Sequence, residues 1–220
     1  MRRRVILVRH GELETGAEKR YIGWLDLPLS ATGRLQAARL REFMAKIPLE
    51  AVYCSDLIRS HTTAQIICEK KGLKPHILTE LREINLGEWE GKTFTEIKRN
   101  FPAAFNKRGD DIANFQPPGG ESFAQCSARA VSALGNILQN SSGNILIVGH
   151  AGTNRAIICH LLGIPLENLF KIRQDYGCIN EFIVSCTHIN LRSLNCFPFP
   201  LKGERKEINQ PEMKDSWLGG

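Results

Sequence analysis

The chain has 220 residues, of which 42% are apolar and 24% are charged, a composition typical of globular proteins and not of disordered ones. This length fits one α/β domain with a full core, with room for appendages. The formal net charge of +6 suits anionic ligands. Because the basic residues are scattered and no recognition motif accompanies them, we expect a small phosphorylated ligand and no nucleic acid partner.

The apolar runs are too short to cross a bilayer, so we expect no membrane partner. Arginines at 2–4 could open a secretory signal, but the apolar run behind them ends at once in Arg9 and His10. We therefore expect a cytoplasmic protein with a mature N-terminus. The seven cysteines are odd in number and no pair has C-x-x-C spacing, which predicts reduced, mostly buried thiols.

Strands and helices are expected to alternate along the chain. Short apolar runs predict strands at 4–8, 51–54, 76–79 and 144–148, and a final strand pair at 178–186 and 188–195. Periodic segments predict helices at 30–47, 55–71, 122–139 and 152–162. This alternation predicts a three-layer α/β fold, a mostly parallel sheet with helices on both faces.

Local signals predict the helix faces and caps. The first helix should bury one face made of Leu35, Ala38, Phe43, Met44 and Ile47. Ser55 or Asp56 is expected to cap the second helix, and Ser122 with Gln125 has capping-box spacing.

We expect one domain over residues 1–197. Residues 11–28 lack periodicity and predict a long loop. Residues 81–118 mix loop and short helix over more length than a plain connection needs, which predicts a lid-like insertion over the site. The Pro-rich C-terminal tail, 198–220, is expected to be ordered only in patches.

Two of the predicted strands run directly into histidine. His10 follows the strand 4–8 and His150 follows the strand 144–148, each with glycine close behind. Ligands of open α/β sheets bind beyond the carboxyl ends of the strands, so we expect the two imidazoles to face one another there. One such histidine alone is more often structural, but two in the same context favour a functional site.

Two arginines are expected at the same edge of the sheet. Arg9 precedes His10, and Arg59 lies in the first turn of the helix 55–71, whose N-terminus adds N–H groups and a positive dipole. Guanidinium groups bind phosphate in a planar, two-pronged way. Either arginine alone is more often a surface ion-pair partner, whereas with the histidines they predict an oxyanion pocket.

Four motifs in chain order resemble the histidine phosphatase superfamily, the phosphoglycerate-mutase-like group. They are Arg9-His10-Gly11-Glu12, Ser55-Asp56-Leu57-Ile58-Arg59-Ser60, Glu83 ahead of Leu86-Gly87-Glu88-Trp89-Glu90-Gly91, and Gly149-His150-Ala151-Gly152. The resemblance runs from about residue 4 to 195. It implies a phosphoglycerate-mutase-like fold and an enzyme that cleaves phosphate monoesters.

The resemblance also implies a role for each matching residue. His10 would be the nucleophile that becomes phosphohistidine, and Glu83 would give a proton to the leaving oxygen. Arg9, Arg59 and His150 would hold the phosphoryl oxygens. Preplaced cations of this kind stabilise the developing charge, so no metal and no cofactor are implied.

Further positions of the resemblance concern substrate binding. Arg20 and Gly23 match the usual loop, and Ala151 follows the second histidine as a further substrate contact. One position departs: the family often has Asn six residues after the nucleophile, where this chain has Gly16. A hydrogen bond to the phosphate is therefore missing there or is supplied by Thr15 or Glu14.

The residues after Glu83 bear on the reaction. Ile84 and Leu86 are apolar, whereas a mutase needs cations there for the second anionic group of its substrate. We therefore expect hydrolysis, with phosphoglycerate mutase as an alternative. A phosphoryl-ligand binding module without activity is a further alternative, which the intact His10, Glu83 and His150 argue against.

Softer local features resemble the α-ribazole phosphatase subfamily, which acts in cobalamin biosynthesis. They are Pro118–Phe123, Asp175–Cys178 and Leu191–Asn195. Trp24, Trp89 and Phe123 are candidates to stack on an aromatic base, and equally candidates for the core. Broad-specificity sugar-phosphate phosphatases share some of these features and stay an alternative, and a homodimer stays open.

Overall fold

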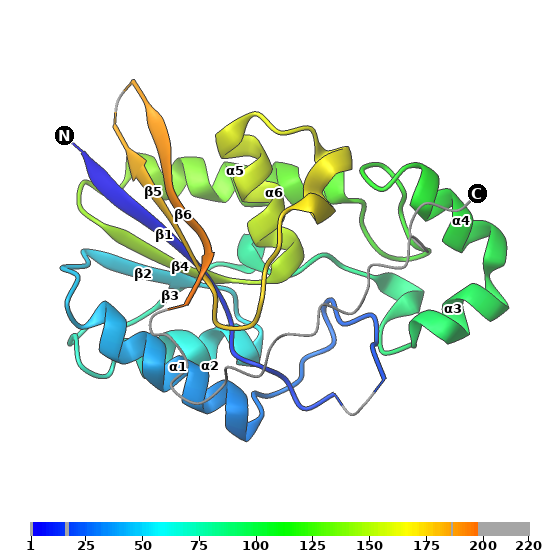
Figure 1. The fold of residues 1–220 in the computed structure, drawn as a ribbon, viewed down its shortest axis with the longest axis horizontal. Coiled ribbons are helices and arrows are strands. Elements are labelled where there is room, and N and C mark those ends of the chain that lie inside the picture. The colour runs from blue at the N-terminus through cyan, green and yellow to red at the C-terminus, as the bar shows by residue number, and fades with distance from the viewer. Residues whose placement is uncertain (1, 16–17, 186, 198–220) are drawn as a thin grey trace, which may run out of the picture.

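The computed structural model describes residues 2–15, 18–185 and 187–197 (Figure 1). At its centre lies a six-stranded sheet in the order β3-β2-β4-β1-β5-β6. The strands are β1 (Arg3–Arg9), β2 (Ala51–Cys54), β3 (His76–Ile77), β4 (Ile145–Gly149), β5 (Ile179–Val184) and β6 (Ile189–Cys196). The first four are mutually parallel, while β5 and β6 add an antiparallel edge, so the predicted mostly parallel sheet is confirmed.

Helices cover both faces of the sheet (Figure 1). They are α1 (Ala31–Met44), α2 (Ile58–Cys68), α3 (Phe94–Asn100), α4 (Pro102–Asp110), α5 (Phe123–Gln139) and α6 (Ala151–Leu162). Alternate residues of β1 point to opposite faces: Val5 and Leu7 join the core under α5 and α6, and Ile6 and Val8 join the core under α1 and α2. The three-layer α/β prediction is confirmed.

The buried face of α1 differs from the predicted one. Gly33, Ala37, Leu40 and Met44 are buried, whereas Leu35 is 53% exposed. The buried set follows the helical repeat of three and four residues, and Leu35 lies two residues from Gly33, on the far side of the helix. The prediction for Leu35 was wrong because one apolar residue carries little information about a helix face.

The predicted cap of α2 was also wrong. The helix begins at Ile58 after Leu57, whose side chain caps nothing. Ser55 instead contacts His150, and Asp56 forms an ion pair with Arg82. Ser55 and Asp56 therefore make tertiary contacts and do not cap α2.

The capping-box prediction for α5 is confirmed to the residue. The Ser122 hydroxyl accepts from the Gln125 N–H at 3.2 Å, and the Gln125 side chain accepts from the Ser122 N–H at 2.8 Å. Both partners lie within one turn, so nothing distant competes with them.

Residues 81–118 leave the sheet and form α3, α4 and the 3₁₀ turn Gly87–Trp89 (Figure 1). Trp89 is 1% exposed and packs against Tyr21 and Phe115. It therefore belongs to the core and has no free face to stack on a base. A lid role for the segment stays a prediction. The tail 198–220 and Gly16 lie outside the described residues.

Within the described parts of the chain, no helix is long and apolar enough to span a membrane. The six described cysteines are free, and five of them are buried, as predicted. Burial raises the pKa of the Cys54 and Cys126 thiols to about 12, which makes them poor nucleophiles at neutral pH.

Candidate active site

The two histidines meet at the carboxyl edge of the sheet. β1 and β4 are parallel neighbours whose last paired residues are Arg9 and Gly149. His10 and His150 follow directly, and their ring centroids lie 5.1 Å apart. Both side chains are buried. The predicted juxtaposition is confirmed.

The His10 ring is fixed in one tautomer. Its Nδ1 lies 2.7 Å from the Gly11 carbonyl oxygen, which can only accept, so Nδ1 carries the proton and Nε2 keeps a lone pair. Burial first, then the nearby Arg59 and Arg9, hold the pKa of His10 well below its usual value. The imidazole is therefore neutral at neutral pH, with Nε2 in a nucleophilic form.

Glycine is required beside His10 by the close approach of two backbones. A Cβ at Gly11 would lie 2.3 Å from the carbonyl oxygen of Gly33, in the first turn of α1. The approach brings the loop after β1 onto α1 and fixes the carbonyl that orients the His10 ring.

His150 has a partner at each ring nitrogen. Its Nδ1 accepts from Arg59 Nε at 3.3 Å, so Nε2 carries the proton and donates to the Ser55 hydroxyl at 2.7 Å. Burial, followed by Arg59 and His10, lowers the pKa of His150 well below its usual value. Sequence reasoning missed Ser55, because a serine before a helix is first read as a cap.

Arg59 is a buried cation without a contacting carboxylate among the described residues. It is 1% exposed, and besides His150 it donates to the carbonyl oxygens of Gly23 and Leu25. A guanidinium carries five N–H groups, so two remain for a ligand. Since a buried charge needs compensation, this arrangement suits an anion.

Arg9 is placed in a similar way. Its Nη1 donates to the Gln174 carbonyl oxygen at 2.7 Å, its guanidinium stacks 3.6 Å from the centroid of the Tyr176 ring, and its buried Nε has no hydrogen-bond partner in the described chain. The Tyr176 centroid lies 5.6 Å from that of His10. Sequence reasoning noted the Asp175–Cys178 segment but gave Tyr176 no place in the site.

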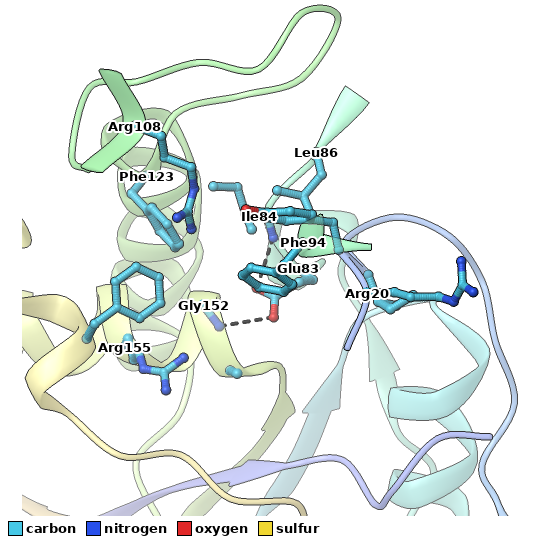
Figure 2. A pocket seen from close by; sticks show the side chains of 13 residues that line it. Arg20, Glu83, Ile84, Leu86, Phe94, Arg108, Phe123, Gly152 and Arg155 are labelled. Atoms are coloured by element: carbon cyan, nitrogen blue, oxygen red, sulfur yellow. Dashed lines mark hydrogen bonds between the residues drawn. The ribbon is translucent and has the colours of Figure 1, made fainter. Parts of the chain in front are cut away.

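Glu83 lies at the N-terminus of α6. Its Oε2 accepts from the Gly152 N–H at 3.0 Å, and its Oε1 accepts from the Ile84 N–H at 2.9 Å (Figure 2). Oε1 also accepts from the Thr153 N–H at 3.1 Å. A Cβ at Gly152 would lie 2.5 Å from Oε1, so glycine is required there. Glu83 is 8% exposed and lines a pocket together with Ala151 and Gly152, the two residues that follow His150.

A clamp from α5 fixes the backbone that carries Glu83. Arg129 donates to the carbonyl oxygens of Glu80, Arg82 and Glu83, at 2.6, 2.8 and 2.9 Å. It also forms an ion pair with Glu121. Sequence reasoning missed Arg129, because its partners are backbone groups about 46 residues away in the chain.

The loop residues that accept from Arg59 are held by Glu90. The carboxylate of Glu90 accepts from the N–H groups of Gly23, Trp24 and Leu25 at 2.9, 2.6 and 3.2 Å. A Cβ at Gly23 would lie 2.1 Å from the Ile84 carbonyl oxygen, so no other residue fits. Sequence reasoning placed Glu90 in the third motif and gave it no role in the site.

Arg20, Gly23 and Ala151 are not equivalent in the structure. Ala151 lines the pocket beside Glu83, and Gly23 contacts Arg59 through its carbonyl oxygen. Arg20 also lines the pocket but is exposed, and its Nη1 donates to the Gly91 carbonyl oxygen at 2.9 Å. Trp24, a stacking candidate, donates from Nε1 to the Glu83 carbonyl oxygen at 2.7 Å.

The pocket beyond Glu83 has a volume of about 160 Å³ and a lining of aromatic, apolar and cationic side chains (Figure 2). Its aromatic members are Tyr21, Phe94, Phe123 and Phe170. Ile84 and Leu86 line it as expected, but Arg108 and Arg155 do so too. The expectation that this region is poor in cations was therefore wrong, because the arginines come from α4 and α6 and not from the residues after Glu83.

Metal-ligand clusters were also sought in the part of the chain that the structure describes. There, no three His, Cys, Asp or Glu side chains are grouped as metal ligands. The cations that face the two histidines are the guanidinium groups of Arg9 and Arg59.

Comparison with known proteins gives the same family in sequence and structure. The model of the histidine phosphatase superfamily (branch 1) matches residues 5–196. The chain is 32% identical over 194 residues to the adenosylcobalamin/alpha-ribazole phosphatase of Salmonella typhimurium, covering 87% of this chain and 96% of that protein. It is 34% identical over 174 residues to the glucosyl-3-phosphoglycerate phosphatase of Mycolicibacterium vanbaalenii, covering 76% and 77%.

A solved structure agrees with these relatives. The alpha-ribazole phosphatase from Shigella flexneri superposes with a TM-score of 0.81 at 30% identity, covering 88% of this chain and 96% of that one. The family model matches residues 5–196, a range that contains all the residues of the candidate site.

Proposed function

This chain belongs to the histidine phosphatase superfamily and is a phosphatase, and we propose that it hydrolyses phosphomonoesters through a covalent phosphohistidine on His10. One observation carries the proposal: a buried, neutral imidazole with an unprotonated Nε2 lies beside two arginines that contact no carboxylate in the described chain. A nucleophile and an anion site are thus adjacent.

In the first step, His10 Nε2 attacks phosphorus, forming a P–N bond as the ester P–O bond breaks. Arg9 and Arg59 bind the phosphoryl oxygens, and the Nε2–H of His150 exchanges its contact with the Ser55 hydroxyl for one with a phosphoryl oxygen. Glu83 gives its proton to the departing alkoxide. The product alcohol leaves, with phosphate retained on His10.

In the second step, the Glu83 carboxylate takes a proton from a water molecule. The water oxygen attacks phosphorus, the P–N bond breaks, and the pair of electrons returns to Nε2. Inorganic phosphate leaves, Glu83 is protonated again, and His10 is restored. The two steps sum to hydrolysis of one ester bond.

Trapping the intermediate tests this proposal. Brief reaction with a ³²P-labelled ester and quenching in base should leave base-stable, acid-labile label on the wild-type protein. His10→Ala should abolish the label, and His160→Ala, a change at an exposed residue of α6, should keep it. Label that persists in His10→Ala would place the nucleophile elsewhere.

For the substrate, we propose α-ribazole 5′-phosphate, as the names of the enterobacterial relatives and three local segments favour. Phe123 and Phe170, with ring centroids 5.7 Å apart, offer aromatic surface beyond Glu83 for a flat base on a neutral ribose. A cytoplasmic location and a possible homodimer stay predictions.

Paired substrates test this assignment. The kcat/KM for α-ribazole 5′-phosphate should exceed that for ribose 5-phosphate, which lacks the base, and Phe170→Ala should reduce the difference. Equal values for both substrates would leave the reaction intact, refute the assignment and favour a broad-specificity sugar-phosphate phosphatase. Transfer of phosphate between positions of phosphoglycerate would instead favour the mutase alternative.

A further inference from the structure

One short segment, just before β5, surrounds Arg9. The Gln174 carbonyl oxygen accepts from Arg9 Nη1 at 2.7 Å, and the Cys178 carbonyl oxygen accepts from the Arg9 backbone N–H at 3.2 Å. The Gly177 N–H donates back to the Arg9 carbonyl oxygen at 3.2 Å. Residues 174–178, which we call the Arg9 cradle, therefore hold both the backbone and the side chain of this arginine.

The half-buried ring of Tyr176 covers one face of the Arg9 guanidinium. The Arg9 Cζ lies 3.6 Å from the centroid of that ring, so the two groups are in direct contact. A cation over an aromatic face is attracted by the ring quadrupole, and more strongly where water is excluded. Arg9 takes part in no ion pair among the described residues. The ring and the Gln174 carbonyl oxygen thus stabilise its charge while no anion is bound.

These two contacts fix the orientation of the guanidinium. The group is planar, so a ring on its face sets its plane, and a carbonyl oxygen at Nη1 sets its rotation within that plane. Its buried Nε has no hydrogen-bond partner among the described residues. The Tyr176 ring also lies 5.6 Å from that of His10. An oriented donor without a partner is therefore presented next to the proposed nucleophile, which suits a phosphoryl oxygen.

The cradle is anchored by Asn195, near the end of β6. The Asn195 side chain accepts from the Asp175 N–H at 2.8 Å and donates to the Asp175 carboxylate at 2.9 Å. The Asn195 N–H donates to the Asn180 side chain at 3.0 Å. With φ at 52°, Asn195 has a left-handed backbone, which asparagine adopts more readily than most residues. The segments Asp175–Cys178 and Leu191–Asn195, separate in the sequence, thus meet behind Arg9.

We propose that Tyr176 is a positioning residue for Arg9 and that its ring sets the affinity of the site for phosphate. The inference deepens the proposed function, in which Arg9 binds a phosphoryl oxygen. Without the ring, the guanidinium is free to tilt, and part of the binding free energy is lost in ordering it again. Tyr176 forms and breaks no bond, so the chemical steps at His10 stay as described.

Binding of inorganic phosphate to the resting enzyme tests the proposal without turnover. Tyr176→Leu should raise the Kd measured by titration calorimetry about tenfold, the effect expected for a largely desolvated contact between a cation and a ring. Tyr176→Phe keeps the ring face and should stay within about twofold of the wild type. A Kd unchanged in Tyr176→Leu, or raised equally in both variants, would overturn the proposal.

A double-mutant cycle shows whether the effect passes through Arg9. In an Arg9→Gln background, Tyr176→Leu should have little further effect on the Kd, because the cation that the ring orients is gone. Losses that simply add would place the role of Tyr176 elsewhere. The NMR signal of the Arg9 Nε–H gives a second measurement: it should shift in Tyr176→Leu and stay in place in Tyr176→Phe.

Two controls separate positioning from folding and from chemistry. Tyr53 is a half-buried tyrosine of β2 that stacks on His76 with ring centroids 5.1 Å apart, so Tyr53→Leu should keep the wild-type Kd whatever stability it loses. Label trapped on His10 from saturating p-nitrophenyl phosphate should still form in Tyr176→Leu. Absence of that label in the wild type would refute phosphohistidine, whereas the pattern of Kd values decides the role of Tyr176 independently.

Discussion

At the scale of single residues, Glu83 is held by its surroundings in one orientation. Three backbone N–H groups fix its two oxygens, and Oε2 accepts from Gly152 alone in the described chain, which leaves a lone pair toward the pocket. A group fixed in this way can transfer a proton at a defined position without reorganising. The same position would serve the alkoxide first and the water molecule afterwards.

Glu83→Gln should slow the reaction more for a leaving group that needs a proton than for one that does not. An alkoxide needs a proton to depart, whereas p-nitrophenolate leaves without one, so phosphohistidine formation from an alkyl phosphate should slow by about 10²–10⁴-fold. The corresponding step with p-nitrophenyl phosphate should slow far less. Pre-steady-state burst kinetics on both esters measures this step directly. Equal losses in the burst rates would show that Glu83 positions the substrate instead of protonating it.

The site residues differed in how far the sequence could reveal them. His10, Arg9 and His150 were predictable because each lies at or directly after the end of a buried strand, and a strand end is a local signal. Ser55 and Tyr176 were not, since each acts through a ring that only folding brings near. Residues with a local signal are found first, and those that support them through space are missed.

At the scale of elements, one carboxylate organises the loop that buries Arg59. Glu90 receives the N–H groups of three successive loop residues and that of Leu86 at 3.1 Å. The same loop turns the carbonyl oxygens of Gly23 and Leu25 toward Arg59. Arg59, the proposed phosphate ligand, is thus positioned through this loop by a carboxylate that does not contact it.

Glu90→Gln should therefore weaken the binding of phosphate in addition to its effect on the fold. An amide keeps one accepting oxygen but cannot accept from all four N–H groups, so the loop should loosen around Arg59. We expect at least a tenfold rise in the inhibition constant of inorganic phosphate. Glu88→Gln, a change at an exposed neighbour in the same turn, is the matched control.

A measurement of global stability separates weaker phosphate binding from misfolding. Urea denaturation without phosphate should show a loss of about 1–2 kcal/mol in Glu90→Gln, the scale of hydrogen bonds to a charged group. If the inhibition constant stays at its wild-type value while stability falls, Glu90 supports the fold and does not position Arg59.

The helices and strands were more predictable than the pocket between them. The start of α5 follows from a capping box within one turn, and the layers follow from the alternation of strands and helices along the chain. Arg108 and Arg155 lie 47 positions apart on α4 and α6, and no spacing rule connects them. Their meeting depends on how residues 81–118 fold back onto the sheet edge, which is a tertiary property.

At the scale of the whole molecule, the buried site lowers the free energy of unfolding in acid. It buries His10 and His150 in neutral form beside Arg9 and Arg59, which lowers the pKa of both imidazoles. The unfolded chain has no such constraint, and its histidines bind protons with a pKa of about 6.5. The phosphatase must therefore lose stability in acid because of the same burial that keeps the proposed nucleophile, His10, neutral.

The sign of this effect follows from proton binding in the two states. Below about pH 6.5 the unfolded state binds protons at both positions while the folded state binds none until a lower pH. Each histidine then contributes a fall of about 1.4 kcal/mol in the free energy of unfolding per pH unit. Above that pH both imidazoles are unprotonated in both states, so they cause no loss of stability and no dependence on pH.

Urea denaturation between about pH 7.5 and pH 5 would measure the slope, above the range where most carboxylates titrate. His10→Asn with His150→Asn should flatten it markedly, whereas His160→Asn, at an exposed position of α6, should leave it unchanged. Inorganic phosphate should raise stability at every pH, since it binds only the folded state. A slope identical in the double variant would mean that the two imidazoles are not held neutral, and the phosphohistidine mechanism would lose its nucleophile in the resting enzyme.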